Sequence, residues 1–145
     1  MPFFVDTSAL FKRYQVEKGT ERVNELLENA HGDAFISSLT VIEVISNLKR
    51  LYEIDRITTE DQFLQQRLFF YHDIEELNIT ILDVVTDDII KAEELILKRY
   101  MKTVDAIQLA VALNNFSLKP TFVSSDQKLC AIAQQEGLPV LNPEA

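Results

Sequence analysis

The 145-residue sequence predicts an α/β protein built around a mainly parallel sheet. Short apolar or β-branched runs alternate along the whole chain with longer stretches of helical periodicity. Strands that alternate with helices in this way pair in parallel through right-handed crossovers. The chain has only 3 Gly and 4 Pro, so its loops should be short. Its length and its 47% hydrophobic content predict a single domain over residues 1–145.

The first half of the chain is expected to contain two strands and four helices. The run PFFV is apolar and ends at an acid, as is typical of a buried strand. Apolar residues within 23–30 recur with the i, i+3, i+4, i+7 spacing of an amphipathic helix. Hydroxyl side chains in residues 37–40, and Thr58 or Thr59, can cap the third and fourth helices. The expected strands are 2–5 and 33–37, and the expected helices are 8–14, 19–30, 38–53 and 59–76.

The second half is expected to contain three strands and three helices. The run ITILDV is rich in the β-branched residues that favour strands. Thr103 and Ser125 are predicted to cap the last two helices, and Gly137 is predicted to end the final one. The expected strands are 79–84, 120–124 and 138–142, and the expected helices are 86–100, 104–115 and 127–137.

Four acidic residues lie where a predicted strand ends or a predicted helix begins: Asp6, Glu43, Asp105 and Asp126. The carboxyl ends of parallel strands form one edge of the sheet, where open α/β proteins bind ligands, so we expect these acids to gather there. Four carboxylates in one place repel one another unless a cation neutralises them. Oxygen ligands without nearby His or Cys suit Mg²⁺ or Mn²⁺, and such ions support phosphate chemistry.

Each acid also has a purely structural interpretation. Asp6 could cap the helix that follows it, and Asp105 and Asp126 are favourable charges at helix N-termini. Glu43 could complete a capping box with Thr40, although apolar residues surround it. These interpretations explain each acid separately, but they do not explain why all four belong to one end of the sheet.

Other chemistries fit the sequence less well. The chain has no Ser-His-Asp set, no G-x-S-x-G, no P-loop and no G-x-G-x-x-G motif. His31 and His72 are distant from predicted strand ends and are expected on the surface. Aspartyl-phosphate phosphatases need a second Asp two residues after the first, where this chain has Ser8. Cys130 lies in an apolar helical run without an activating partner, so it is expected in the core.

The net charge of −9 argues against a simple nucleic-acid-coating protein, but the charge is unevenly distributed. Residues 53–94 hold 12 acidic and 3 basic side chains, whereas the rest of the chain holds 11 of each. A polyanion could therefore approach the predicted site while the acidic segment faces away. Ordinary solvated helix faces are the alternative explanation for the seven basic residues that lie near a candidate acid in the sequence: Lys12, Arg13, Lys49, Arg50, Lys98, Arg99 and Lys102.

Four segments, in order and over nearly the whole chain, resemble motifs of the PIN-domain nucleases, and within that family of the VapC-type toxins of toxin–antitoxin pairs. The opening FVDTSALFKRY resembles the D-[ST]-S-A motif, and TVIEVISNLKR resembles the second acidic motif. KTVDAIQLAVAL is similar to the D-A-I-x-L-A-x-A helix. TFVSSDQKLCAIAQQEGLPVLNP resembles the C-terminal strand, acid and helix that close with G-L-x-V-x-N-P.

The resemblance implies a three-layer α/β/α domain with a short parallel sheet, and an Mg²⁺- or Mn²⁺-dependent endoribonuclease that usually forms a homodimer. It carries Asp6, Glu43, Asp105 and Asp126 over as the catalytic, metal-binding acids. It makes Ser8 a hydroxyl that steadies Asp6 or a water on the metal. A VapC-type toxin would also have an RNA substrate and a cognate antitoxin protein. The alternatives are a non-catalytic PIN-like protein-binding module, a PIN nuclease of RNA processing, and a phosphatase of small phosphate esters.

The sequence also predicts a cytoplasmic location. No stretch reaches the roughly 18 apolar residues of a transmembrane helix. The N-terminus lacks the basic region and the small-residue cleavage site of a signal peptide. We therefore expect no membrane partner.

Overall fold

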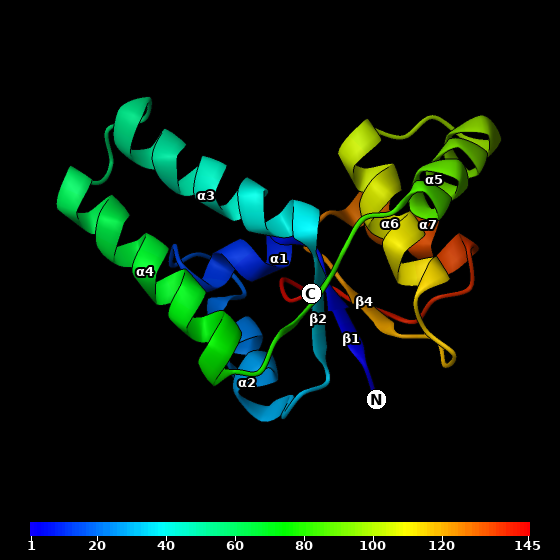
Figure 1. Ribbon diagram of the computed structural model, residues 1–145, viewed down its shortest axis with the longest axis horizontal. Helices are drawn as coiled ribbons and strands as arrows, with labels where there is room; N and C mark the ends of the chain where they lie inside the picture. The colour runs from blue at the N-terminus through cyan, green and yellow to red at the C-terminus, as the bar shows by residue number, and fades with distance from the viewer.

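Five short strands form one sheet in the computed structural model, which describes residues 1–145 (Figure 1). All four strand pairings are parallel, and the strand order is β3-β2-β1-β4-β5. The central strand β1 therefore begins two runs of strands that proceed in opposite directions. A ligand site in such a sheet is expected where the order reverses, beside the carboxyl ends of β1 and β4. The strands are β1 (Phe3–Val5), β2 (Ala34–Ser37), β3 (Thr80–Leu82), β4 (Thr121–Val123) and β5 (Val140–Leu141).

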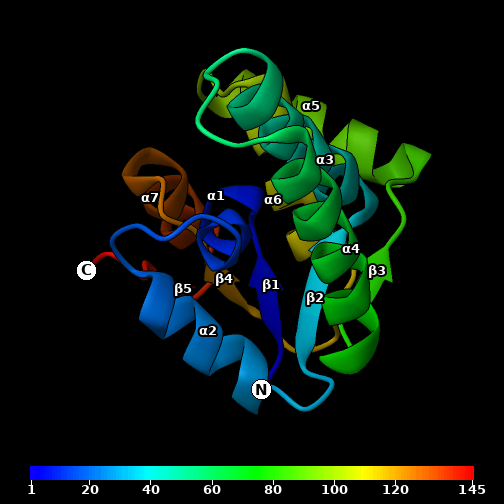
Figure 2. The ribbon, with the colours of Figure 1, turned by 90° about the vertical axis from the view of Figure 1, so that its left-hand side faces the viewer.

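Seven α-helices cover the two faces of the sheet and complete the predicted α/β/α layers (Figure 2). Alternation along the strands divides the core: Val5 and Ile36 pack with the first four helices, whereas Phe4 and Phe122 pack with the last three. The phenyl rings of Phe4 and Phe122 stack with their centroids 5.8 Å apart. The helices are α1 (Thr7–Leu10), α2 (Thr20–Asn29), α3 (Ser38–Glu53), α4 (Glu60–Glu76), α5 (Thr86–Lys98), α6 (Thr103–Asn114) and α7 (Gln127–Gln135).

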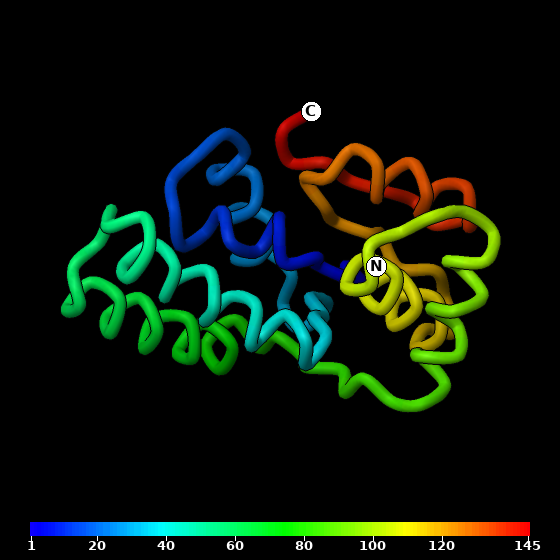
Figure 3. The backbone as a smooth tube through the Cα atoms, turned by 90° about the horizontal axis from the view of Figure 1, so that it is seen from above, coloured from blue at the N-terminus to red at the C-terminus, as the bar shows by residue number.

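The pair α3 and α4 extends beyond the sheet as a helical hairpin, which is clear from two directions (Figures 1 and 3). Asp73 of α4, only 3% exposed, ties the base of this hairpin to the segment after α1. Its carboxylate accepts hydrogen bonds from Arg13 Nε at 2.7 Å and from the Tyr14 hydroxyl at 2.7 Å. These hydrogen bonds therefore fix the base of the hairpin to the segment that follows α1.

Most predicted elements are confirmed, with differences at their ends. The expected helix 8–14 is shorter, because after α1 the chain tightens into a 3₁₀ segment, Phe11–Arg13. The Ser37 hydroxyl accepts from the Thr40 amide at 3.3 Å and caps α3. Thr59 caps α4, as one of the two alternatives predicted.

Two predicted caps are wrong. Thr103 is the first residue of α6 rather than its cap, and the cap position, Lys102, makes no side-chain hydrogen bond to the helix. The cap of α7 is Asp126 instead of Ser125. The carboxylate reaches the amides of Lys128 and Leu129 at 3.0 and 3.1 Å. The cap position lies one residue later than predicted, and this shift places the side chain of Asp126 rather than that of Ser125 within reach of the free amides.

Gly137 ends α7 in the manner predicted for a glycine after a helix. Its φ of +93° is in the left-handed region. The Gly137 amide donates to the Gln134 carbonyl at 2.9 Å, and the Leu138 amide donates to the Ala133 carbonyl at 3.0 Å. This pair of bonds is a Schellman motif, which satisfies the last carbonyl groups of the helix.

The remaining sequence predictions concern single side chains. Cys130 is buried, at 7% exposed, as predicted for a core residue. His31 and His72 are both exposed. None of the helices is both long enough and apolar enough to cross a bilayer.

We expect Gly19→Ala to lower the free energy of unfolding more than Gly137→Ala does. Both glycines have φ of +93°, which costs an alanine about 1–2 kcal/mol. At Gly19 the new Cβ would also lie 2.9 Å from the backbone carbonyl oxygen of Pro143, whereas at Gly137 it meets the flexible end of Lys119 at 3.0 Å. Urea unfolding of both variants measures the difference, and equal losses would contradict the role given to the Pro143 carbonyl.

Candidate active site

The structure brings the segments that carry all four predicted acids to the carboxyl edge of the sheet. Asp6 directly follows β1, and Asp126 lies just beyond β4, the neighbouring strand. Glu43 lies in the second turn of α3, which follows β2 directly, and Asp105 lies in the first turn of α6. Burial is the largest cause that raises the pKa of Asp105, and the charges of Asp6, Asp126 and Glu43 raise it further. The predicted gathering is therefore present in the fold.

Asp6 is the most buried of the four acids, with 5% of its surface exposed. Its Oδ2 accepts hydrogen bonds from the hydroxyls of Ser8 at 2.7 Å and Ser124 at 3.0 Å. Although Asp6 occupies the cap position of α1, its side chain makes no capping hydrogen bond. Burial raises the pKa of this carboxyl group, and the two hydroxyls act in the opposite direction. The two serines thus hold one carboxylate oxygen of Asp6 in a fixed position.

Glu43 is held by a buried polar cluster. The Thr7 hydroxyl donates to Glu43 Oε1 at 2.6 Å, and Gln108 Nε2 lies 3.4 Å from the same oxygen. The Gln108 amide also donates to the Thr40 hydroxyl at 2.6 Å and accepts from the Ser37 hydroxyl at 2.7 Å. Burial raises the pKa of Glu43, and the charge of Asp6 raises it further, whereas the hydrogen bonds from Thr7 and Gln108 lower it. The capping box predicted as an alternative for Glu43 is not formed, because Ser37 caps the helix.

Asp105 and Asp126 differ in how their carboxylates are used. Asp105 makes no hydrogen bond or ion pair, and burial together with the three other acids raises its pKa to about 6. Asp126 Oδ1 caps α7, so the structural interpretation of this acid holds for one of its oxygens. The Asp126 amide donates to Ser124 Oγ at 3.1 Å, which connects this acid to the hydroxyl that holds Asp6.

The donor set fits a hard divalent cation in its chemistry. It consists of carboxylates, with no His or Cys among them, and a bound cation would relieve the repulsion that raises the pKa of Asp105. The acids are neighbours, but nowhere in the chain do three or more His, Cys, Asp or Glu side chains form a ready-made metal site. The carboxylates of Asp6 and Glu43 accept hydrogen bonds from hydroxyl groups of the protein, whereas the carboxylate of Asp105 accepts none.

Five of the seven basic residues that lie near a candidate acid in the sequence are engaged by carboxylates of this chain. Arg50 is the most exposed of the five in its contact, with 3.6 Å between its Nε and Asp55. Lys12 is buried, and its Nζ lies 2.9 Å from Glu17 and 2.8 Å from Glu144. Arg13 is paired with Asp73, with 2.7 Å between Nε and Oδ2. These ion pairs engage Lys12 and Arg13 within the fold, which leaves them less available to a polyanion than their place in the sequence suggested.

The same holds at the C-terminal end of α5. Lys98 and Arg99 both bind Glu136, at 3.0 and 2.7 Å. Lys102 is exposed and has no ion pair, and Lys49 lies over aromatic rings of the helical hairpin. Of the cations near the acids, Lys102 therefore remains the most available to a phosphate.

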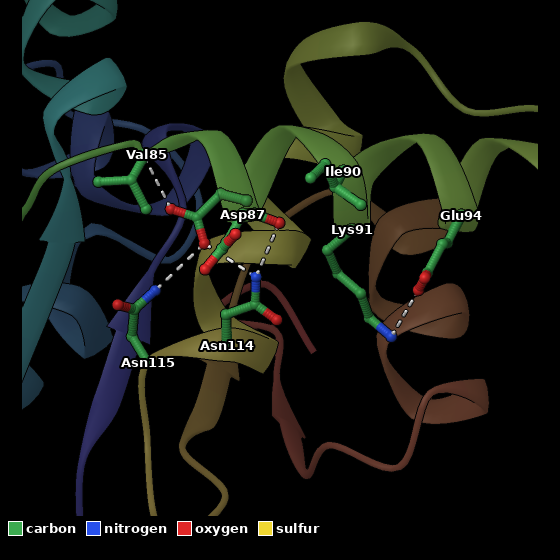
Figure 4. Close-up of a pocket in the computed structure, with 8 residues that line it drawn as sticks. Val85, Asp87, Ile90, Lys91, Glu94, Asn114 and Asn115 are labelled. Carbon is green, nitrogen blue, oxygen red and sulfur yellow. Dashed lines mark hydrogen bonds and ion pairs between the residues drawn. The ribbon is translucent and has the colours of Figure 1, made fainter.

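A hollow of about 510 Å³ lies where α5 meets the end of α6 (Figure 4). Its polar groups bind one another: Asp88 accepts from the Val85 amide at 3.1 Å and from Asn114 Nδ2 at 3.0 Å, and Lys91 pairs with Glu94 at 3.4 Å. None of the four predicted acids lines this hollow. Most of its polar groups are engaged with one another, and it lies apart from the four predicted acids.

Sequence reasoning overlooked Thr7, Gln108 and Ser124, which hold the acids in place. A signal existed for Gln108, because it is the one polar residue in the run AIQLAVAL. It is fully buried, and a buried amide needs partners. Ser124 follows β4 in the same way that Asp6 follows β1. No local pattern pairs these residues with particular acids.

We expect metal-free Asp105→Asn to be more stable than the wild type at pH 7. The raised pKa means that the folded state binds the Asp105 proton more tightly than the unfolded state, so wild-type stability falls as the pH rises from about 4 to about 6. Asparagine removes this loss. The expected gain in the free energy of unfolding at pH 7 is about 1 kcal/mol, since solvent screens the repulsion at a partly exposed side chain. Unfolding in EDTA at pH 4 and pH 7 measures the gain. A gain that is absent at pH 7, or equal at both pH values, would contradict the repulsion.

The comparisons with known proteins agree with this fold. The family model of the PIN domain matches residues 3–135. No curated protein sequence matches the chain. Among solved structures, the chain is similar to a toxin-antitoxin complex from Klebsiella pneumoniae, with a TM-score of 0.68 and 20% identity over 97% of each chain. At this identity the likeness shows a shared fold. Since the family model spans nearly the whole sequence, the chain belongs to the PIN domain family, whose members are generally nucleases.

Proposed function

We propose that this protein is an Mg²⁺- or Mn²⁺-dependent endoribonuclease that hydrolyses RNA phosphodiester bonds. The observation that carries the proposal is the gathering of Asp6, Glu43, Asp105 and Asp126 beside the point where the strand order reverses. Membership of the PIN domain family supports it, because that family consists generally of nucleases.

The roles proposed for the acids follow from how each is held. Asp6 and Asp105 would hold the principal cation, and Glu43 and Asp126 would complete the site. When bound, the cation would activate water, polarise the phosphoryl oxygen and stabilise the leaving oxygen. Ser8 orients Asp6 through its hydrogen bond, so that the carboxylate has a fixed position before substrate arrives.

We further propose that the chain acts in the cytoplasm as the toxin of a VapBC-type pair, as a single domain over residues 1–145 and as a homodimer. The similar Klebsiella structure is a toxin-antitoxin complex, which supports an antitoxin protein as partner. The antitoxin would bind the folded toxin and keep RNA from the acidic site.

A second function, a PIN-like module that binds a protein partner without catalysis, has one observation in its favour. The four acids do not form a ready-made group of metal ligands, and one oxygen of Asp126 serves as a helix cap. In this alternative the carboxylates are structural, and no divalent cation binds at the edge of the sheet.

We expect Asp6→Asn to abolish metal-dependent RNA cleavage, with a loss of more than about 100-fold, because removing even an outer partner of a metal ligand costs about 10–100-fold. Ser8→Ala should therefore cost about tenfold. Gel assays of mixed RNA with Mn²⁺, Mg²⁺ or EDTA measure the rates. Asp83→Asn, at an exposed acid after β3, is the matched control and should cleave as the wild type does. Undiminished cleavage by Asp6→Asn would contradict the role of Asp6 in metal binding.

We also expect Mn²⁺ to raise the melting temperature. An ion present at about 100 times its Kd adds about 2.7 kcal/mol to the free energy of unfolding, since it binds the folded state alone. For a domain of this size the rise should be several degrees. Scanning calorimetry with millimolar Mn²⁺, compared with EDTA, measures it, and the double variant Asp6→Asn, Asp105→Asn should not respond. An unchanged wild-type melting temperature would favour the non-catalytic module.

A further inference from the structure

A small cavity opens beside two of the four acids. It has a volume of about 200 Å³ and lies between the α5–α6 connection and the first turns of α7. Asp105 and Asp126 both contribute to its wall, so anything that enters it lies against the proposed active site. The other lining residues are Tyr100, Met101, Lys102, Lys128, Leu129 and Ile132.

The walls of the cavity are suited to a flat, apolar ring. Met101 and Leu129 are buried and give it an apolar floor. Tyr100 also lines the cavity, and with 83% of its surface exposed its ring is accessible to a ligand. A closed cavity of about 150 Å³ in another protein holds benzene, so the space here is sufficient for one aromatic ring.

Two free cations flank this ring-sized space. Lys102 and Lys128 are exposed, and neither forms an ion pair. This distinguishes them from Lys98 and Arg99, which Glu136 neutralises. An aromatic platform beside unpaired ammonium groups is the combination by which proteins bind single-stranded nucleic acids, with bases stacked and phosphates neutralised.

We propose that this cavity binds one base of a single-stranded RNA, in the nucleotide next to the phosphate that is cleaved. Tyr100 stacks on the base, and Lys102 and Lys128 contact the flanking phosphates. The inference rests on the proposed nuclease function and deepens it. The base that enters the cavity must be unpaired, because a base paired within a duplex cannot reach it.

Binding of a fluorescent single-stranded RNA of about 12 nucleotides, followed by anisotropy in the Asp6→Asn background with EDTA, tests the stacking. Tyr100→Ala should raise the Kd at least about fivefold, whereas Tyr100→Phe should remain within about twofold, since stacking needs the ring and not the hydroxyl. Tyr71→Ala is the matched control, an exposed tyrosine on α4 that does not line the cavity. The same strand annealed to its complement should bind more weakly than the single strand.

The lysines have a separate readout in the salt dependence of the Kd. Lys102→Ala combined with Lys128→Ala should reduce the slope of log Kd against log salt by about 1.4, or about 0.7 for each phosphate that no longer has an ammonium partner. The matched control is Lys18→Ala combined with Lys119→Ala, which removes two exposed lysines that do not line the cavity.

Unchanged affinity in Tyr100→Ala, equal affinity for duplex and single strand, or an unchanged salt slope in the lysine variant would each overturn the proposal. Because binding is measured without cleavage, its failure differs from failure of the proposed function. The latter would appear as absence of metal-dependent cleavage by the wild type. Since Tyr100 is exposed, its replacement leaves the fold intact, and melting of each variant verifies this.

Discussion

Burial of the Asp6 carboxylate at the end of the central strand is the constraint on which the site depends. A carboxylate removed from water needs hydrogen-bond donors or a cation, and Asp6 obtains two hydroxyl donors, Ser8 and Ser124. Ser8 follows Asp6 along the chain, whereas Ser124 directly follows the adjacent strand β4. Pairing of β1 with β4 therefore completes the support of this acid, and it also brings Asp126 to the same edge.

The site is built where the two helical layers meet at that edge. Asp6 and Glu43 lie at the start of helices of one layer, and Asp105 and Asp126 lie at the start of helices of the other. Gln108 of α6 joins the layers, because its amide binds threonines from α1 and α3. Packing of the two cores on opposite faces of the sheet thus fixes the spacing of acids that are far apart in the sequence.

The basic and acidic side chains around the site differ in whether they form ion pairs within the fold. Buried or partly buried cations such as Lys12 and Arg13 form ion pairs within the fold, where removing one partner would leave a buried charge. The acids of the site have no such partners, and their mutual repulsion destabilises the metal-free protein. A bound cation would relieve that repulsion. The exposed Lys102 and Lys128 form no ion pair within the chain.

The sequence by itself determined the α/β class, nearly every strand and helix, the burial of Cys130 and the four acids as candidates. Hydrophobic periodicity, capping residues and short motifs are local, and local patterns are readable along the chain. Only the tertiary structure decided which polar groups meet. It decided that Asp126 rather than Ser125 caps α7, that Gln108 lies beside Glu43, and that five of the seven basic residues near the acids form ion pairs within the chain. Such pairings depend on distances between segments far apart in the sequence, which the packing of both helical layers on the sheet sets.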